Sequence, residues 1–250
     1  MPLLAEAWSD LADLILPTGC AGCGATGTRR TYGVCPGCAA ALEELVPAPA
    51  RPIPAPAGLP PTISLGGYDG VLREALLAYK ERGRHGLAVP LGGLLAEAVA
   101  VAAGRRRAVV LIPVPSTARA ARARYGDHLG RLAVQAAGRL RRAGWPVVVQ
   151  RPLRAVARPD SVALSSAARA ASAAGAFRLR GHRLARLRGS VADATVVVLD
   201  DVITTGATLA AVAGELTRAG VPVAAAAVLA ATRRRAIPHL GGGFPTRRDA

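Results

Sequence analysis

The stretch that decides the fold runs Val196-Val-Val-Leu-Asp-Asp-Val-Ile-Thr-Thr-Gly-Ala-Thr-Leu209. Its first four residues are apolar and mostly β-branched, which is typical of a strand buried on both faces. Asp200 and Asp201 end that predicted strand, at the edge where an open parallel sheet holds its ligands. A small, hydroxyl-rich loop over 204–208 then leads into a predicted helix over 209–219. The stretch therefore predicts a strand, an acidic pair and a helix N-terminus in immediate succession.

This arrangement suits a sugar phosphate. Backbone N–H groups at the start of a helix bind a phosphate dianion, and carboxylates accept hydrogen bonds from ribose hydroxyls. An ordinary strand-to-helix turn with Asp as a helix cap would explain one acid and one Thr, but not two acids with three Thr and a Gly in register. The predicted phosphate loop comprises Thr204, Thr205, Gly206, Ala207 and Thr208.

All four cysteines of the chain lie in two Cys-x-x-Cys pairs, Cys20/Cys23 and Cys35/Cys38, separated by eleven residues. Four thiolates on two short turns match a tetrahedral Zn²⁺ site, and they leave no open position for catalysis. Two disulfides or a thioredoxin-like redox pair are the alternatives. Disulfides need an oxidising compartment and a redox motif needs no duplicate, so we expect structural zinc.

The chain has a formal net charge of +16, carried almost wholly by arginine. Codon usage explains arginine in place of lysine, but it does not explain 32 basic against 16 acidic residues. The excess is compatible with a polyanionic partner or with a plain solvated surface. Aromatic residues make up only 3%, which argues against an extended base-stacking platform.

No apolar run is long enough for a membrane span. The first 20 residues do not match a signal peptide, because acidic residues interrupt them and their apolar residues fall at helical spacing. We therefore expect a cytoplasmic protein with an amphipathic helix at its amino end.

The chain divides into an amino-terminal helix and four-cysteine module (1–46), a Pro-rich linker (47–62), an α/β domain (63–235) and a disordered tail (236–250). The linker is assigned because seven prolines lie between Val46 and Pro61. Helices are predicted over 68–81, 87–103, 127–143, 165–174 and 209–219, and strands over 108–114, 147–150, 196–199 and 223–229. Such alternation predicts a mostly parallel sheet flanked by helices.

The stretch at 196–209 closely resembles the phosphoribosyl-pyrophosphate (PRPP) motif of type I phosphoribosyltransferases. With the cysteine pairs in front of it, the chain resembles the ComF family of competence-associated phosphoribosyltransferase-like proteins. Further resemblances are Tyr68–Arg73 followed by Lys80, Ile112–Ser116, the segment 122–128, and Arg169 with Gly175–Phe177. The resemblance implies a type I phosphoribosyltransferase-like α/β fold with a small zinc-ribbon-like module. Tyr125–His128, Ser161 and Ser172 depart from the family pattern.

The resemblance also implies a chemistry. PRPP would lose pyrophosphate from C1 of ribose through an oxocarbenium-like transition state, with Mg²⁺ bridging the pyrophosphate and the ribose hydroxyls. Asp200 and Asp201 would hold the hydroxyls, and the loop over 204–208 would hold the 5′-phosphate. The residues expected to face the pyrophosphate are Pro115, Ser116, Arg122, Arg124 and Lys80, although each of these cations could equally be a surface charge.

Three functions remain open at this point. The chain could transfer a phosphoribosyl group to an unknown acceptor, or bind PRPP or a ribose-5-phosphate-like ligand without transfer. It could also handle incoming single-stranded DNA together with a competence helicase, an expectation that comes from the family resemblance and the basic charge. We interpret His128 as an ordinary helix residue, and we expect removal of Asp201 to leave stability unchanged because two adjacent like charges do not help the ligand-free fold.

Overall fold

The computed structural model describes residues 19–105, 108–123, 126–156, 175–190 and 193–232. Their centre is a six-stranded sheet in the order β1 (Ala48–Pro49), β2 (Thr62–Gly67), β8 (Ala225–Ala231), β7 (Thr195–Ile203), β3 (Val109–Pro113) and β4 (Val147–Val149). All neighbours pair in parallel except β1 and β2. The innermost strands β3, β7 and β8 are almost wholly buried, as expected for parallel strands covered on both faces.

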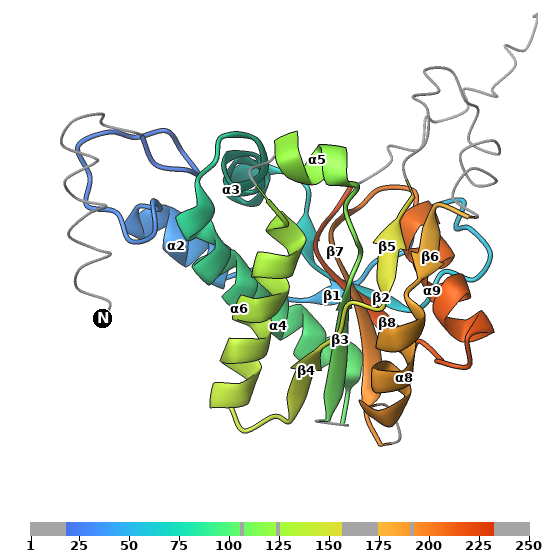
Figure 1. Cartoon of the computed structure of the whole chain (residues 1–250). Coiled ribbons are helices and arrows are strands. Elements are labelled where there is room, and N and C mark those ends of the chain that lie inside the picture. Colours follow the sequence, from blue (N-terminus) through green and yellow to red (C-terminus); the bar gives the residue numbers. More distant parts are fainter. Residues whose placement is uncertain (1–18, 106–107, 124–125, 157–174, 191–192, 233–250) are drawn as a thin grey trace, which may run out of the picture.

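Helices cover both faces of the sheet (Figure 1). One face carries α4 (Ala88–Ala103), which is preceded by the 3₁₀ turn η1 (His85–Leu87), and α6 (His128–Arg142). The other carries α9 (Ala207–Arg218) and α8 (Gly181–Ser190), beside the two-stranded sheet β5 (Leu153–Ala155) and β6 (Phe177–Leu179). Helices α3 (Gly70–Glu81) and α5 (Ala118–Ala123) lie near the carboxyl ends of the strands. The predicted α/β architecture is therefore confirmed.

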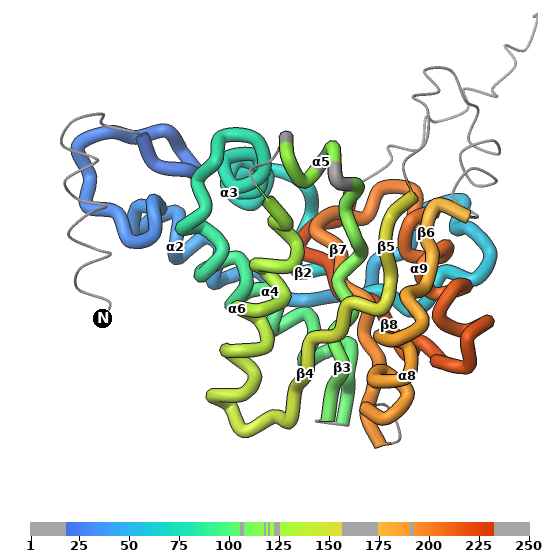
Figure 2. The backbone as a smooth tube through the Cα atoms, in the orientation of Figure 1, coloured from blue at the N-terminus to red at the C-terminus, as the bar shows by residue number. Residues whose placement is uncertain are grey.

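The cysteine module, residues 19–44, packs beside α3 and contains α2 (Pro36–Glu43). The backbone trace in Figure 2 shows that it joins the α/β domain through the Pro-rich segment. That segment is not only a spacer. It contributes β1 to the sheet and buries Leu59, and the amide of Ala50 donates to the carbonyl of Thr62 at 2.9 Å.

Two further expectations need correction. Asp200 and Asp201 do not end their strand, because β7 continues to Ile203 by pairing with β8. Pairing with β3, in contrast, stops at Leu199, so the acids lie where one neighbouring strand has already ended. Sequence patterns also missed β2, whose Gly66 and Gly67 interrupt the apolar run. The predicted amino-terminal helix, the helix over 165–174 and the tail lie outside the described residues.

One helical stretch, His85–Ala103, is long and apolar enough to cross a membrane by length and composition alone, contrary to the expectation from the sequence. Just over half of it is buried inside the domain, where α4 packs against β2, β8 and α6. We therefore interpret it as the central core helix of one face of the sheet.

Candidate functional site

The candidate site lies at the carboxyl ends of β3 and β7. The chain leaves β3 through α6 toward β4 at the sheet edge, and it leaves β7 through α9 toward β8 on the opposite side. Such a reversal of direction between neighbouring parallel strands opens a crevice where α/β proteins bind ligands. Pro113 pairs with Leu199, so the loop after β3 leaves the sheet directly beside Asp200.

Asp201 is the centre of a buried polar network. Its Oδ2 lies 2.9 Å from Nζ of Lys80 on α3 and 2.9 Å from Nε2 of His128, the first residue of α6. Since a carboxylate only accepts, Nε2 of His128 carries the proton. Nδ1 of His128 is buried and has no hydrogen-bond partner within the described residues. The hydroxyl of Tyr79 donates to the backbone carbonyl of His128 at 2.6 Å, which ties α3 to α6 beside the pair.

The pKa values of the two adjacent carboxyl groups are shifted in opposite directions. Burial and the neighbouring charge of Asp201 raise the pKa of Asp200 to about 8. Burial alone would also raise the pKa of Asp201, but the hydrogen bond from His128 and the charge of Lys80 lower it to about 2. Asp201 is therefore the ionised member of the pair, and Asp200 is the member whose charge lacks a strong protein partner.

The two side chains also differ in burial and in the direction in which they point. Successive side chains of a strand point to opposite faces, and Asp201 is 7% exposed on the face that carries Lys80 and His128. Asp200 remains half-buried, and its Oδ1 accepts the N–H of Asp201 at 2.9 Å. Asp200 is thus the carboxylate that stays accessible to a ligand, whereas the sequence led us to expect that both acids would hold the ribose hydroxyls.

The predicted phosphate loop joins β7 to α9 through Thr204, Thr205 and Gly206. Gly206 is the N-cap residue of α9 with φ 76°, a left-handed conformation that glycine adopts without strain. A Cβ there would lie 3.0 Å from Cδ1 of Leu59 in the Pro-rich segment. The hydroxyl of Thr205 accepts from the N–H of Ala207 at 3.4 Å, and the first N–H groups of the helix face the loop without intrahelical acceptors.

The structure gathers some of the other predicted residues and separates others. Lys80 reaches the site, but it pairs with Asp201. Pro115 and Ser116 are half-buried in the loop after β3, where the amide of Val114 donates to the carbonyl of Leu199. Arg122 is exposed on α5, and Arg124 lies outside the described residues.

Sequence reasoning missed His128 and Tyr79. His128 was interpreted as an ordinary helix residue, yet its ring is buried against Asp201. The available signal was Asp127, a helix cap whose Oδ1 accepts the N–H of Gly130 and which places the next residue in the first turn at the strand ends. Tyr79 could have been noticed only through its position next to Lys80.

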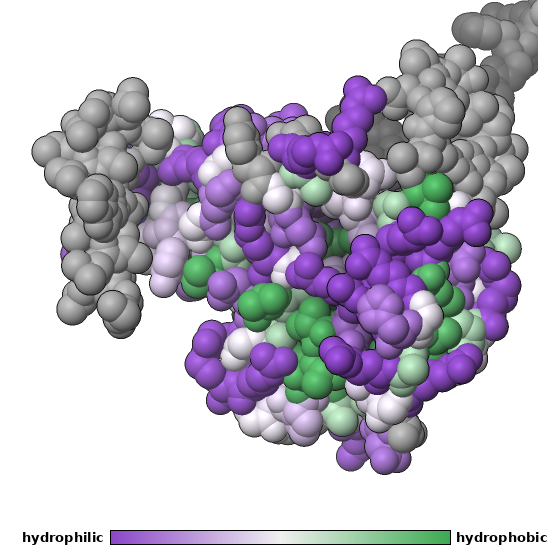
Figure 3. Space-filling view, viewed as in Figure 1, coloured by the Kyte–Doolittle hydropathy of each residue, from purple (hydrophilic) through white to green (hydrophobic). Residues whose placement is uncertain are grey.

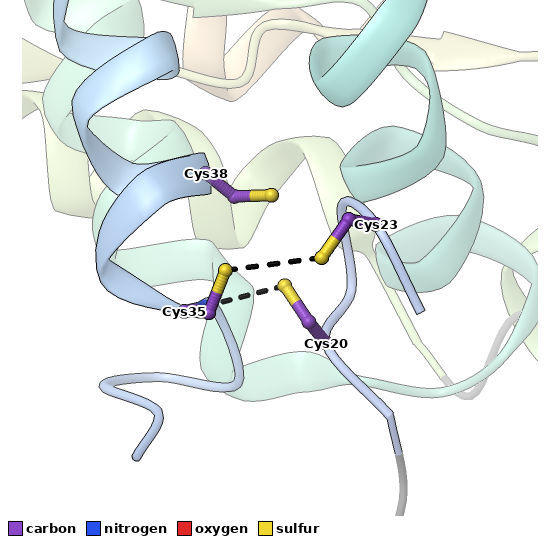
Figure 4. Close-up of side chains that lie close together, drawn as sticks. All are labelled: Cys20, Cys23, Cys35 and Cys38. Atoms are coloured by element: carbon purple, nitrogen blue, oxygen red, sulfur yellow. Dashed lines mark hydrogen bonds between the residues drawn. The ribbon is translucent and has the colours of Figure 1, made fainter. Parts of the chain in front are cut away.

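The four cysteines converge on one point (Figure 4). Their sulfur atoms all lie within 4.8 Å of one another, and those of Cys23 and Cys35 are 3.8 Å apart. Sulfurs bound at about 2.3 Å to a tetrahedral Zn²⁺ are separated by about 3.8 Å, so the cluster fits zinc. All four are free thiols, and a sulfur separation of 3.8 Å is far longer than a disulfide bond.

Backbone N–H groups support the cluster as they do in zinc knuckles. Sγ of Cys20 accepts from the amides of Cys35 at 3.2 Å and Gly22 at 3.4 Å. Burial alone would raise the pKa of the Cys20 thiol, but these backbone hydrogen bonds lower it to about 6. Burial raises the pKa of Cys38, together with the neighbouring cysteines. A bound cation would overcome that second shift, because a coordinating thiol loses its proton.

Two cavities of about 440 and 450 Å³ lie elsewhere in the described part of the molecule. The first lies between the starts of α4 and α6, around Arg131 and Arg151, and the second beside Trp145 at the amino ends of β3 and β4. Neither cavity contains Asp200, Asp201 or the loop before α9, so the candidate site is identified by its residues and not by cavity volume.

The sheet topology, the acidic pair and the loop that opens α9 are the features by which the chain can be compared with known families. The family model described as the phosphoribosyl transferase domain matches residues 137–242. The chain contains a phosphoribosyltransferase-type domain. The match includes β7, the acidic pair and the phosphate loop, whereas Lys80, His128 and the cysteines lie in front of it. None of the curated proteins compared with the chain matches it.

Proposed function

We propose that this chain binds PRPP at the carboxyl ends of β3 and β7 and transfers the phosphoribosyl group to an acceptor. The observation that carries the proposal is the short connection after β7, which puts the accessible Asp200 and the first N–H groups of α9 at one edge. Asp200 would accept a hydrogen bond from a ribose hydroxyl, and the loop over 204–208 would hold the 5′-phosphate.

Transfer would break the bond from C1 to the pyrophosphate oxygen and release pyrophosphate with the electron pair. A bond would form from C1 to the acceptor, whose displaced proton would pass to solvent. Pro115 and Ser116, beside Leu199, are placed to face the pyrophosphate through their backbone and hydroxyl. Asp200 would supply, together with the pyrophosphate oxygens, the hard oxygen ligands that Mg²⁺ prefers. When bound, Mg²⁺ would neutralise the charge of the leaving group.

Lys80 and His128 have a supporting part in this proposal. Both bind Asp201, so they fix the end of β7 and keep the Asp201 carboxylate turned away from the ligand. The cysteine cluster in front of the phosphoribosyltransferase-type domain supports a ComF-like protein, and its free thiols fit a cytoplasmic location.

Titration calorimetry with PRPP and Mg²⁺ tests binding, and release of pyrophosphate in the presence of candidate acceptors tests transfer. Binding of PRPP without any release would favour a ribose-phosphate-binding protein over an enzyme. Absence of PRPP binding by zinc-loaded protein would contradict both.

A second candidate function, single-stranded DNA binding, is favoured by an arginine face on β5 and β6. Arg154 and Arg178 stand directly opposite each other across this antiparallel pair and are both exposed. Like charges in such a position destabilise a sheet unless an anion lies between them. Neither these two nor Arg180 and Arg186 has an ion-pair partner among the described residues. Figure 3 shows hydrophilic residues gathered over β6 and α8.

The salt dependence of single-stranded DNA affinity distinguishes binding by this arginine face from attraction by the overall positive charge. Replacing Arg154 and Arg178 with Ala should reduce the slope of log K against log salt by about 0.7 for each lost phosphate contact. The matched control replaces Arg82 and Arg218, which are exposed and already paired with Glu74 and Glu215. Equal effects of the two double variants would remove the arginine face as a DNA site.

A further inference from the structure

Arg84 connects the cysteine module to the last turn of α3. Helix α3 ends at Glu81. Gly83, which has φ 67°, follows it, and the amide of Arg84 donates to the carbonyl of Ala78 at 3.2 Å. The Arg84 side chain reaches in the opposite direction. Its Nη1 donates to the carbonyl of Gly19 at 2.6 Å and its Nη2 to the carbonyl of Gly33 at 3.2 Å.

These two carbonyls lie just before the two Cys-x-x-Cys turns of the cysteine cluster, Cys20–Cys23 and Cys35–Cys38, which we call its knuckles. Gly19 directly precedes Cys20, and Gly33 lies two residues before Cys35. Gly33 has φ 83°, and a Cβ at this position would lie 2.7 Å from Nη2 of Arg84. The guanidinium therefore fills a place that only glycine leaves open, and it links both knuckles.

The other end of α3 also contacts the cysteine module. A Cβ at Gly22 would lie 2.7 Å from Cγ1 of Val71 and 2.8 Å from Sγ of Cys38. The first turn of α3 thus packs against the metal knuckle itself. The helix is held by the module at its start and immediately after its end.

The last turn of α3 is the part that enters the candidate site. It carries Tyr79, whose hydroxyl donates to the carbonyl of His128, and Lys80, whose Nζ lies 2.9 Å from Asp201. Any shift of α3 along or away from the sheet would move both contacts together.

We propose that Arg84 is a positioning residue that couples the metal-bearing cysteine module to the sugar-phosphate site by holding Lys80 against Asp201. Metal release would separate the two knuckles, free the last turn of α3 and loosen the end of β7. The ligand part of this inference rests on the proposed function, whereas the link from the module to Lys80 does not.

Lys80 is the only lysine in the chain, which gives a direct test. Acetylation of its amine by acetic anhydride, followed by mass spectrometry of the peptide, reports how often Lys80 leaves Asp201 without any ligand. We expect several-fold faster acetylation in Arg84→Gln and in wild type stripped of zinc, and recovery of the wild-type rate when zinc is returned. The control Arg82→Gln, which changes an exposed ion pair with Glu74, should react like wild type. Unchanged rates in Arg84→Gln and in stripped protein would overturn the proposal.

Two further measurements keep the test independent of simple misfolding. Arg84→Lys keeps the charge, but a single ammonium group is less able to bind both carbonyls at once. Its rate of Lys80 acetylation should therefore lie between those of wild type and Arg84→Gln. In a double-mutant cycle, Arg84→Gln should weaken PRPP affinity several-fold in wild type but not in a Lys80→Met background. An equal loss in both backgrounds would show that Arg84 does not act through Lys80. If wild type binds no PRPP, the proposed function fails while the acetylation result still decides the coupling.

Discussion

Asp200 and Asp201 are neighbours whose environments differ: the N–H of Asp201 donates to Oδ1 of Asp200 at 2.9 Å, while the Asp201 carboxylate turns to Lys80 and His128. One acid is thus part of the fold and the other remains available at the strand end. This division changes the expectation that removing Asp201 would leave stability unchanged, because Asp201 is the ion-pair partner of Lys80 within the described residues.

The same conservative change should therefore have opposite effects at the two positions. Asp201→Asn leaves the half-buried Lys80 cation unpaired and should lower the free energy of unfolding by about 1–3 kcal/mol. Asp200→Asn removes a half-buried charge that repels Asp201. This change should raise the free energy of unfolding by about 1 kcal/mol at pH 8. Urea unfolding measures both, with Asp193→Asn, in the exposed turn before the same strand, as the neutral control. Equal destabilisation at 200 and 201 would contradict this division.

Stability should also fall as the pH rises from about 4 to 8. The unfolded chain loses the Asp200 proton near its ordinary pKa of 3.8, whereas the folded chain keeps it until about pH 8. The folded state binds more protons in that interval, so raising the pH favours unfolding. Asp201 acts in the opposite sense, because its stabilising charge is lost between about pH 4 and 2. Urea unfolding midpoints should decrease less between pH 5 and 8 in Asp200→Asn than in wild type. An identical decrease in the two proteins would refute the raised pKa of Asp200.

Gly206 should not tolerate a side chain, and α9 supplies its own control. Gly206→Ala forces a left-handed conformation and moves a Cβ toward Leu59, so it should cost about 1–2 kcal/mol. Gly214→Ala, in the interior of the same helix with open space around it, should gain about 0.5–1 kcal/mol. Thermal unfolding compares the two. The added atom would meet Leu59 of the Pro-rich segment.

Purified protein should carry about one Zn²⁺ per chain. Cys35→Ser should release it, and metal analysis with thiol titration measures the result. Because Val71 and Arg84 contact the cysteine module, hydrogen exchange should increase in α3 as well as in the module. Protein without zinc whose cysteines are oxidised in pairs would overturn the metal assignment.

Local patterns predicted the elements whose evidence is contained in one stretch of chain. The apolar run of β7, the loop before α9 and the two cysteine pairs each have a signature a few residues long. The sequence could not reveal contacts that depend on how separate elements pack. Lys80, His128 and Asp201 meet only because α3, α6 and β7 converge, and Leu59 covers Gly206 only because the Pro-rich segment folds back onto the sheet.

The measurement that tests the central claim most directly is titration calorimetry of PRPP with Mg²⁺ against zinc-loaded wild type, Asp200→Asn and Asp193→Asn. Measured above pH 8, where the Asp200 carboxyl group is ionised, Asp200→Asn should weaken binding about tenfold or more, because a charge-assisted hydrogen bond contributes about 1.5–3 kcal/mol. Asp193→Asn should bind like wild type. If wild type binds no PRPP, or if all three proteins bind it equally, the carboxyl end of β7 is not a PRPP site.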